Sequence, residues 1–191
     1  MSTQPSGSQA GSTQFATSWA FVEALFNKQR AYFASDATKS YEWRVDQLER
    51  LVRMLKENYQ RFADASCQDF KTASQENVFE VSATIATAEF ARSQVKEWMK
   101  PVEASRPKFL AASGHQGMVY REPYGVTLII CPFKGPLLLS LCPTVAALSA
   151  GDPCILKLSE AFLATDELLQ NSFRDISRRN LSAPSAAAGK Q

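Results

Sequence analysis

The sequence lacks an excess of charge of either sign, and it lacks cysteine pairs of the kind that hold metals or form redox motifs. Its 191 residues carry 21 basic and 19 acidic side chains, a formal net charge of +2. This balance gives no reason to expect nucleic acid or an anionic membrane as a partner. The four cysteines form no C-x-x-C pair and have no metal-ligand spacing, so no metal site is predicted. They are Cys67, Cys131, Cys142 and Cys154.

A secretory signal and a long uninterrupted apolar segment are also missing. Residues 1–14 are rich in Ser, Thr, Gln and Gly, which predicts a disordered tail rather than a signal peptide. The longest apolar run, Val126–Leu148, is interrupted by Lys134, Gly135 and prolines, so we predict no membrane-spanning helix. We therefore expect a reduced, soluble protein of the cytoplasm.

Residues 15–105 are predicted to be helical. A first helix is expected over about Thr17–Phe33, with Trp19, Val22, Phe26 and Phe33 on one face, followed by a polar break at Ser35–Ser40.

The clearest periodic signal follows this break. Apolar residues spaced by alternating threes and fours lie on one helical stripe, with Arg44 away from it. The stripe consists of Val45, Leu48, Val52, Leu55, Tyr59 and Phe62. It covers fewer than three heptads, which favours packing within a globular fold over a coiled coil. A third helix is predicted over Glu76–Met99, because Pro101 cannot continue it.

Residues 106–180 have a different character and predict a βαβ unit. After a connecting segment, Arg106–Gly117, and a short strand at Met118–Arg121, the apolar run Gly125–Cys131 is typical of a strand buried on both faces. Pro136 suits the first turn of a helix that ends at Gly151. A second buried strand is expected at Cys154–Lys157, and Ser159 is predicted to cap a last helix from Glu160 to about Phe173. Residues 181–191 are predicted to be a flexible tail.

A strand, a helix and a strand in this order imply a parallel pair with a right-handed crossover. In such sheets, ligands bind beyond the carboxyl ends of the strands. Lys134 closely follows the first strand, and Lys157, Ser159 and Glu160 lie at and beyond the end of the second. The sequence therefore predicts a binding site for a cofactor or substrate at this edge.

Two motifs in this region resemble those of the aldehyde dehydrogenase family. Glu122-Pro-Tyr-Gly-Val126 followed by Leu128–Pro136 is similar to the family pattern E-P-L-G-V…I-G-P-W-N-Y-P. Ala150-Gly151 followed by Leu156-Lys-Leu-Ser-Glu160 resembles A-A-G-N…L-K-P-S-E. Upstream, Thr38–Leu48 looks like the helical entry of the class-three-like branch. The resemblance extends from about Trp19 to Leu169 and implies an α/β fold, in which amino-terminal helices precede an incomplete Rossmann-like, dinucleotide-binding βαβ unit.

The resemblance implies that the chain takes part in NAD(P)-dependent oxidation of an aldehyde to a carboxylic acid. Lys157 and Glu160 would face the adenosine ribose of NAD or NADP, with Ser159 in the same motif, and Pro132 and Phe133 would line the nicotinamide side. An ammonium and a carboxylate can both hydrogen-bond ribose hydroxyls. Alternatively, Lys157 is a surface charge at a strand end and Ser159 only a helix cap.

The sequence departs from the family pattern at points that bear on catalysis. Lys134 occupies the position of the asparagine that donates a hydrogen bond to the family's oxyanion, and loss of such a donor costs about 3 kcal/mol in comparable sites. Leu158 replaces the proline of L-K-P-S-E. The family's nucleophilic cysteine, general-base glutamate and nicotinamide loop lie downstream of the matched region, so the catalytic residues are unknown here.

We therefore expect a truncated aldehyde dehydrogenase-like protein that is not a self-sufficient enzyme. One alternative is a non-catalytic pseudoenzyme, in which a second copy or a full-length relative covers the exposed sheet edge. Another is a repurposed enzyme in which Lys134, flanked by apolar residues, reacts with carbonyls, although an exposed turn lysine explains the same residues. The product of a broken gene is a further hypothesis, because the tail after Arg179 follows no family pattern.

Overall fold

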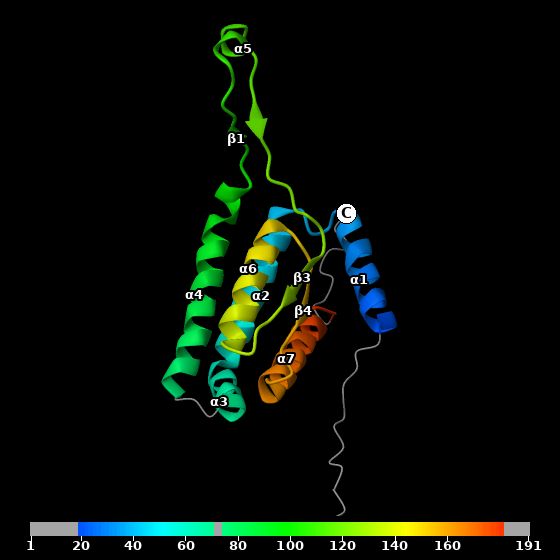
Figure 1. Cartoon of the computed structure of the whole chain (residues 1–191), viewed down its shortest axis with the longest axis vertical. Helices are drawn as coiled ribbons and strands as arrows, with labels where there is room; N and C mark the ends of the chain where they lie inside the picture. Colours follow the sequence, from blue (N-terminus) through cyan, green and yellow to red (C-terminus); the bar gives the residue numbers. More distant parts are fainter. Residues whose placement is uncertain (1–18, 71–73, 182–191) are drawn as a thin grey trace, which may run out of the picture.

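The computed structural model describes residues 19–70 and 74–181 as a helical body from which one arm extends (Figure 1). The tails predicted at 1–14 and 182–191 lie outside these ranges, whereas Leu181, which we assigned to the tail, is the last residue of a helix. The helices are α1 Trp19–Ala34, α2 Tyr41–Glu57, α3 Tyr59–Phe70, α4 Ser74–Trp98, α5 Lys108–Ala112, α6 Pro136–Ala150 and α7 Leu163–Leu181. The strands are β1 Val102–Glu103, β2 Met118–Val119, β3 Thr127–Ile130 and β4 Cys154–Lys157.

The apolar stripe from Val45 to Phe62 divides between two helices instead of lying on one. The main chain leaves the helical conformation at Asn58, whose backbone and side-chain amides both donate to Met54 O, at 3.1 and 3.0 Å. Leu48, Leu55 and Phe62 are nevertheless fully buried. Val45, Val52 and Tyr59 of the stripe are only half-buried, and Leu51 and Met54, which are not on it, are buried. The periodicity thus identified part of the core, and it did not detect the end of α2.

The core lies where α2, α3, α4, α6 and α7 meet. Val81, Ala88 and Val95 of α4 face Leu137 and Leu141 of α6, and all five are inaccessible to solvent. Burial of these apolar side chains is the main stabilising term of the body.

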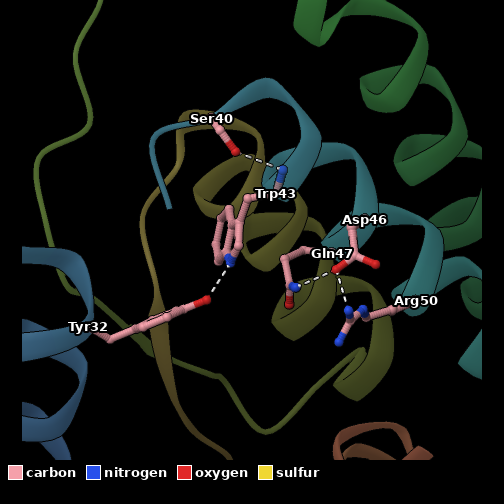
Figure 2. Close-up of polar contacts among 6 residues, drawn as sticks. All are labelled: Tyr32, Ser40, Trp43, Asp46, Gln47 and Arg50. Atoms are coloured by element: carbon pink, nitrogen blue, oxygen red, sulfur yellow. Dashed lines mark hydrogen bonds and ion pairs between the residues drawn. The ribbon is translucent and has the colours of Figure 1, made fainter. Parts of the chain in front are cut away.

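The helix α1 lies at the side of the body (Figure 1) and contributes no buried residue. Contrary to the predicted apolar face, Trp19 and Phe26 are exposed. The attachment to α2 is visible in Figure 2, where Trp43 Nε1 donates to Tyr32 Oη at 2.8 Å and Ser40 caps α2. On the next turn of α2, Asp46 accepts from Gln47 and pairs with Arg50.

Two small sheets are present in the described residues. The strands β3 and β4 are parallel, with Ile130 opposite Lys157, as the βαβ prediction requires. The strands β1 and β2 are antiparallel and form the base of the arm, with α5 at its tip (Figure 1). We predicted β2 as a short strand, but β1 lies within residues 15–105, which we predicted to be helical, and α5 lies within the predicted connecting segment.

The prediction that β3 is buried on both faces is wrong. Ile129 is buried against α6, whereas Leu128 and Ile130 on the opposite face are 58% and 71% exposed. In β4, Lys157 is exposed and the other three residues are only half-buried. The reason is that α6 covers one face of this pair and no described helix covers the other, so an apolar sheet face remains open.

Candidate functional site at the carboxyl edge of the parallel pair

The residues that follow β3 and β4 meet at one edge of the sheet, as predicted. The backbone N–H of Cys131 donates to the Lys157 carbonyl at 2.9 Å, which extends the parallel ladder to the point where both strands end. Beyond this bond, Pro132, Phe133 and Lys134 are all exposed. The edge therefore presents an apolar ring and an ammonium group to solvent.

Lys157 and Glu160 form an ion pair at this edge, with Lys157 Nζ donating to Glu160 Oε1. The hydrogen bond from Lys157 lowers the pKa of the Glu160 carboxyl, helped by a backbone hydrogen bond and by the charge of Lys157. Both side chains are largely exposed. A ligand with hydroxyl groups could therefore approach both an ammonium and a carboxylate from solvent.

Ser159 does not cap a helix that starts at Glu160. Its Oγ accepts from the Ala161 backbone N–H at 3.3 Å, within a turn, and α7 begins only at Leu163. The cap comes from α3 instead: the carboxylate of Asp69 accepts from the N–H groups of Ala164 and Thr165, both at 2.9 Å. Because Asp69 is some 95 residues away in sequence, a local pattern could not reveal it.

The loop between β3 and α6 contains the residues that replace W-N-Y-P. Gly135 has a left-handed conformation at φ 64°, and Pro136 occupies the first turn of α6 as predicted. Glu80 of α4 reaches this helix end, where its Oε2 accepts from the N–H groups of Leu137 and Leu138 at 3.2 and 3.4 Å. Sequence reasoning missed Glu80, which places a carboxylate beside the positive end of the helix dipole and close to the turn that holds Lys134.

Two buried charges organise the opposite edge of the sheet. Asp152 Oδ1 accepts from Gly125 N at 2.9 Å, which ties the segment before β3 to the segment before β4. Arg44, which we placed on the polar side of its helix, is buried and donates to the carbonyls of Ser149 and Lys39, each at 3.2 Å. These contacts fix the ends of α6 and β4, and with them the position of the carboxyl edge.

The cysteines do not provide an activated thiol at this edge. Cys131 is buried, and loss of solvation raises the pKa of its thiol. Cys154 lies at the start of β4, at the other edge of the pair, and burial raises the pKa of its thiol to about 11. His115 lies exposed near the tip of the arm, with its Nδ1 2.8 Å from Ser113 Oγ. Within the described ranges, no three metal-ligating side chains cluster and no helix is long and apolar enough to cross a membrane.

A parallel pair crossed by a helix, with polar loops at its carboxyl edge and helices before it, is the beginning of an open α/β fold of the dehydrogenase type. The sequence model of the aldehyde dehydrogenase family matches residues 2–177. The chain therefore belongs to the aldehyde dehydrogenase family.

The curated relatives belong to the same branch that the motifs resemble. The chain is 36% identical over 148 residues to aldehyde dehydrogenase family 3 member B1 of Rattus norvegicus, covering 77% of this chain and 31% of that protein. It is 34% identical over 154 residues to the chloroplastic family 3 member I1 of Arabidopsis thaliana, covering 79% and 27%. The chain thus spans about a third of the length of the relatives that it matches.

Solved structures show the same fold. Substrate-bound AldH of Staphylococcus aureus superposes with a TM-score of 0.77 at 27% identity, over 81% of this chain and 34% of that one. Succinic semialdehyde dehydrogenase of Streptococcus pyogenes, in complex with NADP+, superposes with a TM-score of 0.73 at 14% identity, over 84% and 34%. The chain is therefore a partial, amino-terminal segment of the aldehyde dehydrogenase fold.

Proposed function

We propose that the carboxyl edge of β3 and β4 is part of an NAD(P) site that serves aldehyde oxidation. The observation that carries the proposal is the parallel register, which brings Phe133 and the pair Lys157–Glu160 to one edge of the sheet. In this site Lys157 and Glu160 bind the adenosine ribose, with Ser159 beside them. Pro132 and Phe133 lie on the nicotinamide side.

The residues present fit such a cofactor. Lys157 and Glu160 are exposed and already adjacent, so their donor and acceptor atoms can bind neighbouring hydroxyls without rearrangement of the main chain. Ile130 and Phe133, 71% and 72% exposed, give a planar ring an apolar surface beside the strand ends. When bound, the nicotinamide accepts a hydride from the substrate.

This segment supplies only part of the catalytic machinery. Lys134 stands where the family pattern has its oxyanion asparagine, and the thiol of Cys131, which follows β3, is buried and has a raised pKa. A catalytic thiol needs a lowered pKa or an adjacent base. We therefore infer that the 191-residue chain holds a cofactor half-site and does not oxidise aldehydes by itself.

Calorimetric titration of NAD+ and NADP+ into the purified chain tests this proposal. Saturable binding that is lost in Lys157→Ala and in Glu160→Gln would support the half-site. Lys108→Ala, an exposed lysine at the start of α5, is the matched control and should bind as the unmodified chain does. Absence of binding by a folded chain, or equal binding by all variants, would contradict it.

A second candidate function, a non-catalytic interaction protein, is favoured by the open face of β3. Leu128 and Ile130 form an apolar surface on a sheet whose outer strand edges are also unpaired in the described residues. We propose that a second copy of this chain or a full-length relative covers this face. Native mass spectrometry with and without such a relative should show a complex that Leu128→Lys abolishes, and an unchanged complex in that variant would exclude this face.

A further inference from the structure

A hollow lies at the carboxyl-terminal end of α6, away from the Lys134 turn. It has a volume of about 580 Å³ and is formed by the carboxyl-terminal halves of α4 and α6, the start of α2 and the segment that returns from the arm. These elements converge at the base of the arm (Figure 1). A volume of this size is within the range of small-molecule sites.

The walls of this hollow, which we call the arm-base pocket, are mostly apolar. They include Phe90, Ala91, Trp98, Val145 and Ala146. The rings of Phe90 and Trp98 pack edge to face, with centroids 6.1 Å apart and planes at 66°. This edge-to-face pair gives the pocket one aromatic wall.

The hydroxyl groups that line the arm-base pocket are already engaged. Thr87 Oγ1 donates to Ala83 O at 2.8 Å, and Ser149 Oγ donates to Val145 O at 2.6 Å. Cys142 Sγ in turn donates to Thr87 Oγ1 at 3.8 Å, so the side-chain donors that remain to bind an anion are those of the arginines.

Two guanidinium groups and one carboxylate line the pocket. Arg44 is 6% exposed, donates only to neutral carbonyls, and its Nε has no hydrogen-bond partner. Arg121 is exposed and donates to Trp98 O at 3.2 Å, while Glu122 supplies the single negative charge of the lining. Burial lowers the pKa of Arg44, with the charge of Asp152 acting in the opposite direction. Asp152 thus compensates this buried cation in part, but Arg44 Nε still has no hydrogen-bond acceptor, and a bound anion would supply one.

We propose that the arm-base pocket binds an apolar monocarboxylate, with its chain or ring between α4 and α6 and its carboxylate toward Arg121 and Arg44. The apolar walls take up the hydrocarbon, and the net positive lining selects an acid over the corresponding alcohol. The ligand carries a single carboxylate, because the negative charge of Glu122 would repel a second one. Nothing in this site depends on the residues of the carboxyl edge.

Calorimetry with octanoate and 1-octanol, which share an apolar chain, tests the proposal on the whole chain. Octanoate should bind saturably and at least about tenfold more tightly than 1-octanol, since a hydrogen bond to a charged group is worth about that factor. Arg121→Gln should remove this preference, and Arg53→Gln, on the exposed side of α2, should not. Arg121 is exposed, so its replacement avoids the unfolding that loss of the buried Arg44 could cause.

Two further measurements locate the bound acid. Ala146→Trp, at an exposed position in the pocket wall, should abolish octanoate binding while circular dichroism stays unchanged. Octanoate should also slow alkylation of Cys142, which lines the pocket, and leave alkylation of Cys67 in α3 unaffected, as read by peptide mass spectrometry. Equal affinity for acid and alcohol, binding that persists in Ala146→Trp, or no protection of Cys142 would each overturn the proposal.

Discussion

At the scale of single residues, Gly151 shows how closely the ends of the elements fit together. It ends α6 at φ 92°, a conformation that favours glycine. A Cβ atom at this position would lie 2.9 Å from Thr38 O and 3.0 Å from two nitrogen atoms of Arg44. The sequence identified Gly151 as the end of the helix, but the contact with Arg44 is a tertiary one.

We predict that Gly151→Ala lowers the free energy of unfolding by about 2–4 kcal/mol, because strain at positive φ and overpacking add together. Gly114→Ala is the control: Gly114 has φ 80° and nothing within 4 Å of the added Cβ, so only the backbone term applies. Urea denaturation of both variants measures the difference. Equal losses would mean that the contact with Arg44 and Thr38 carries no cost.

A second prediction at this scale concerns the charge pair at the carboxyl edge. The pKa of Glu160 lies below its ordinary value of 4.5, chiefly because Lys157 donates a hydrogen bond to it. A carboxyl group whose pKa falls on folding contributes stability above its unfolded pKa, and that contribution disappears as the pH drops through the folded pKa. Because Glu160 is exposed, we expect the effect on overall stability to be small.

Carbon-detected NMR titration of the Glu160 carboxyl can check this directly. In Lys157→Met the midpoint should rise toward 4.5, whereas Lys56→Met, which removes the partner of Glu89, should leave Glu160 unchanged. A midpoint of Glu160 that does not respond to Lys157→Met would show that the ion pair does not form in solution.

At the scale of elements, the helices are held at their ends by residues from other helices. Asp69 of α3 caps α7, and Glu80 of α4 accepts from the first N–H groups of α6. Both carboxylates oppose the positive end of a helix dipole. This cross-capping fixes α6 and α7 relative to the helical layer that precedes them, and so fixes the loops that follow β3 and β4.

The next prediction distinguishes Ser159, the cap that we predicted for the last helix, from Asp69, the cap that the structure shows. Asp69→Ala should lower the free energy of unfolding by about 1–2 kcal/mol, since two N–H groups lose their acceptor. Ser159→Ala should cost less than about 0.5 kcal/mol, because its Oγ accepts only one 3.3 Å bond in a turn. Chemical denaturation measures both losses in the free energy of unfolding. A larger loss in Ser159→Ala than in Asp69→Ala would show that Ser159 is the cap of α7.

At the scale of the whole molecule, the chain is a helical layer with a two-stranded parallel sheet that is covered on one face. The same helices that order the carboxyl edge leave Leu128 and Ile130 in solvent. The chain covers about a third of each relative named above, and within residues 19–70 and 74–181 no element covers the second face of the sheet.

The corresponding prediction is that the chain alone, given NAD+ and a medium-chain aldehyde, forms no NADH. The reason is that burial disfavours deprotonation of Cys131 at the carboxyl edge and of Cys154 at the start of β4, where the pKa is about 11. Alkylation by iodoacetamide should accordingly be slow at Cys154 near neutral pH and should increase as the pH approaches 11. Steady turnover, abolished by replacement of any one cysteine, would contradict this view.

What the sequence by itself determined is local. The strands β3 and β4, the limits of α6 at Pro136 and Gly151, and the order strand, helix, strand follow from β-branched runs and from the backbone preferences of proline and glycine. These are properties of neighbouring residues, and they also placed Lys134, Lys157, Ser159 and Glu160 at one edge. The motifs that identify the family lie in the same segments.

The features that only the tertiary structure decided depend on residues that are distant in sequence. The burial of Arg44, the caps by Asp69 and Glu80 and the open face of β3 each result from which elements meet in space. A continuous apolar strand is compatible with one covered face or two, because periodicity records which residues are apolar and not what covers them. Which helices cover the sheet is a property of the whole fold. Among the described residues α6 covers one face of β3 and β4, and the face with Leu128 and Ile130 stays exposed.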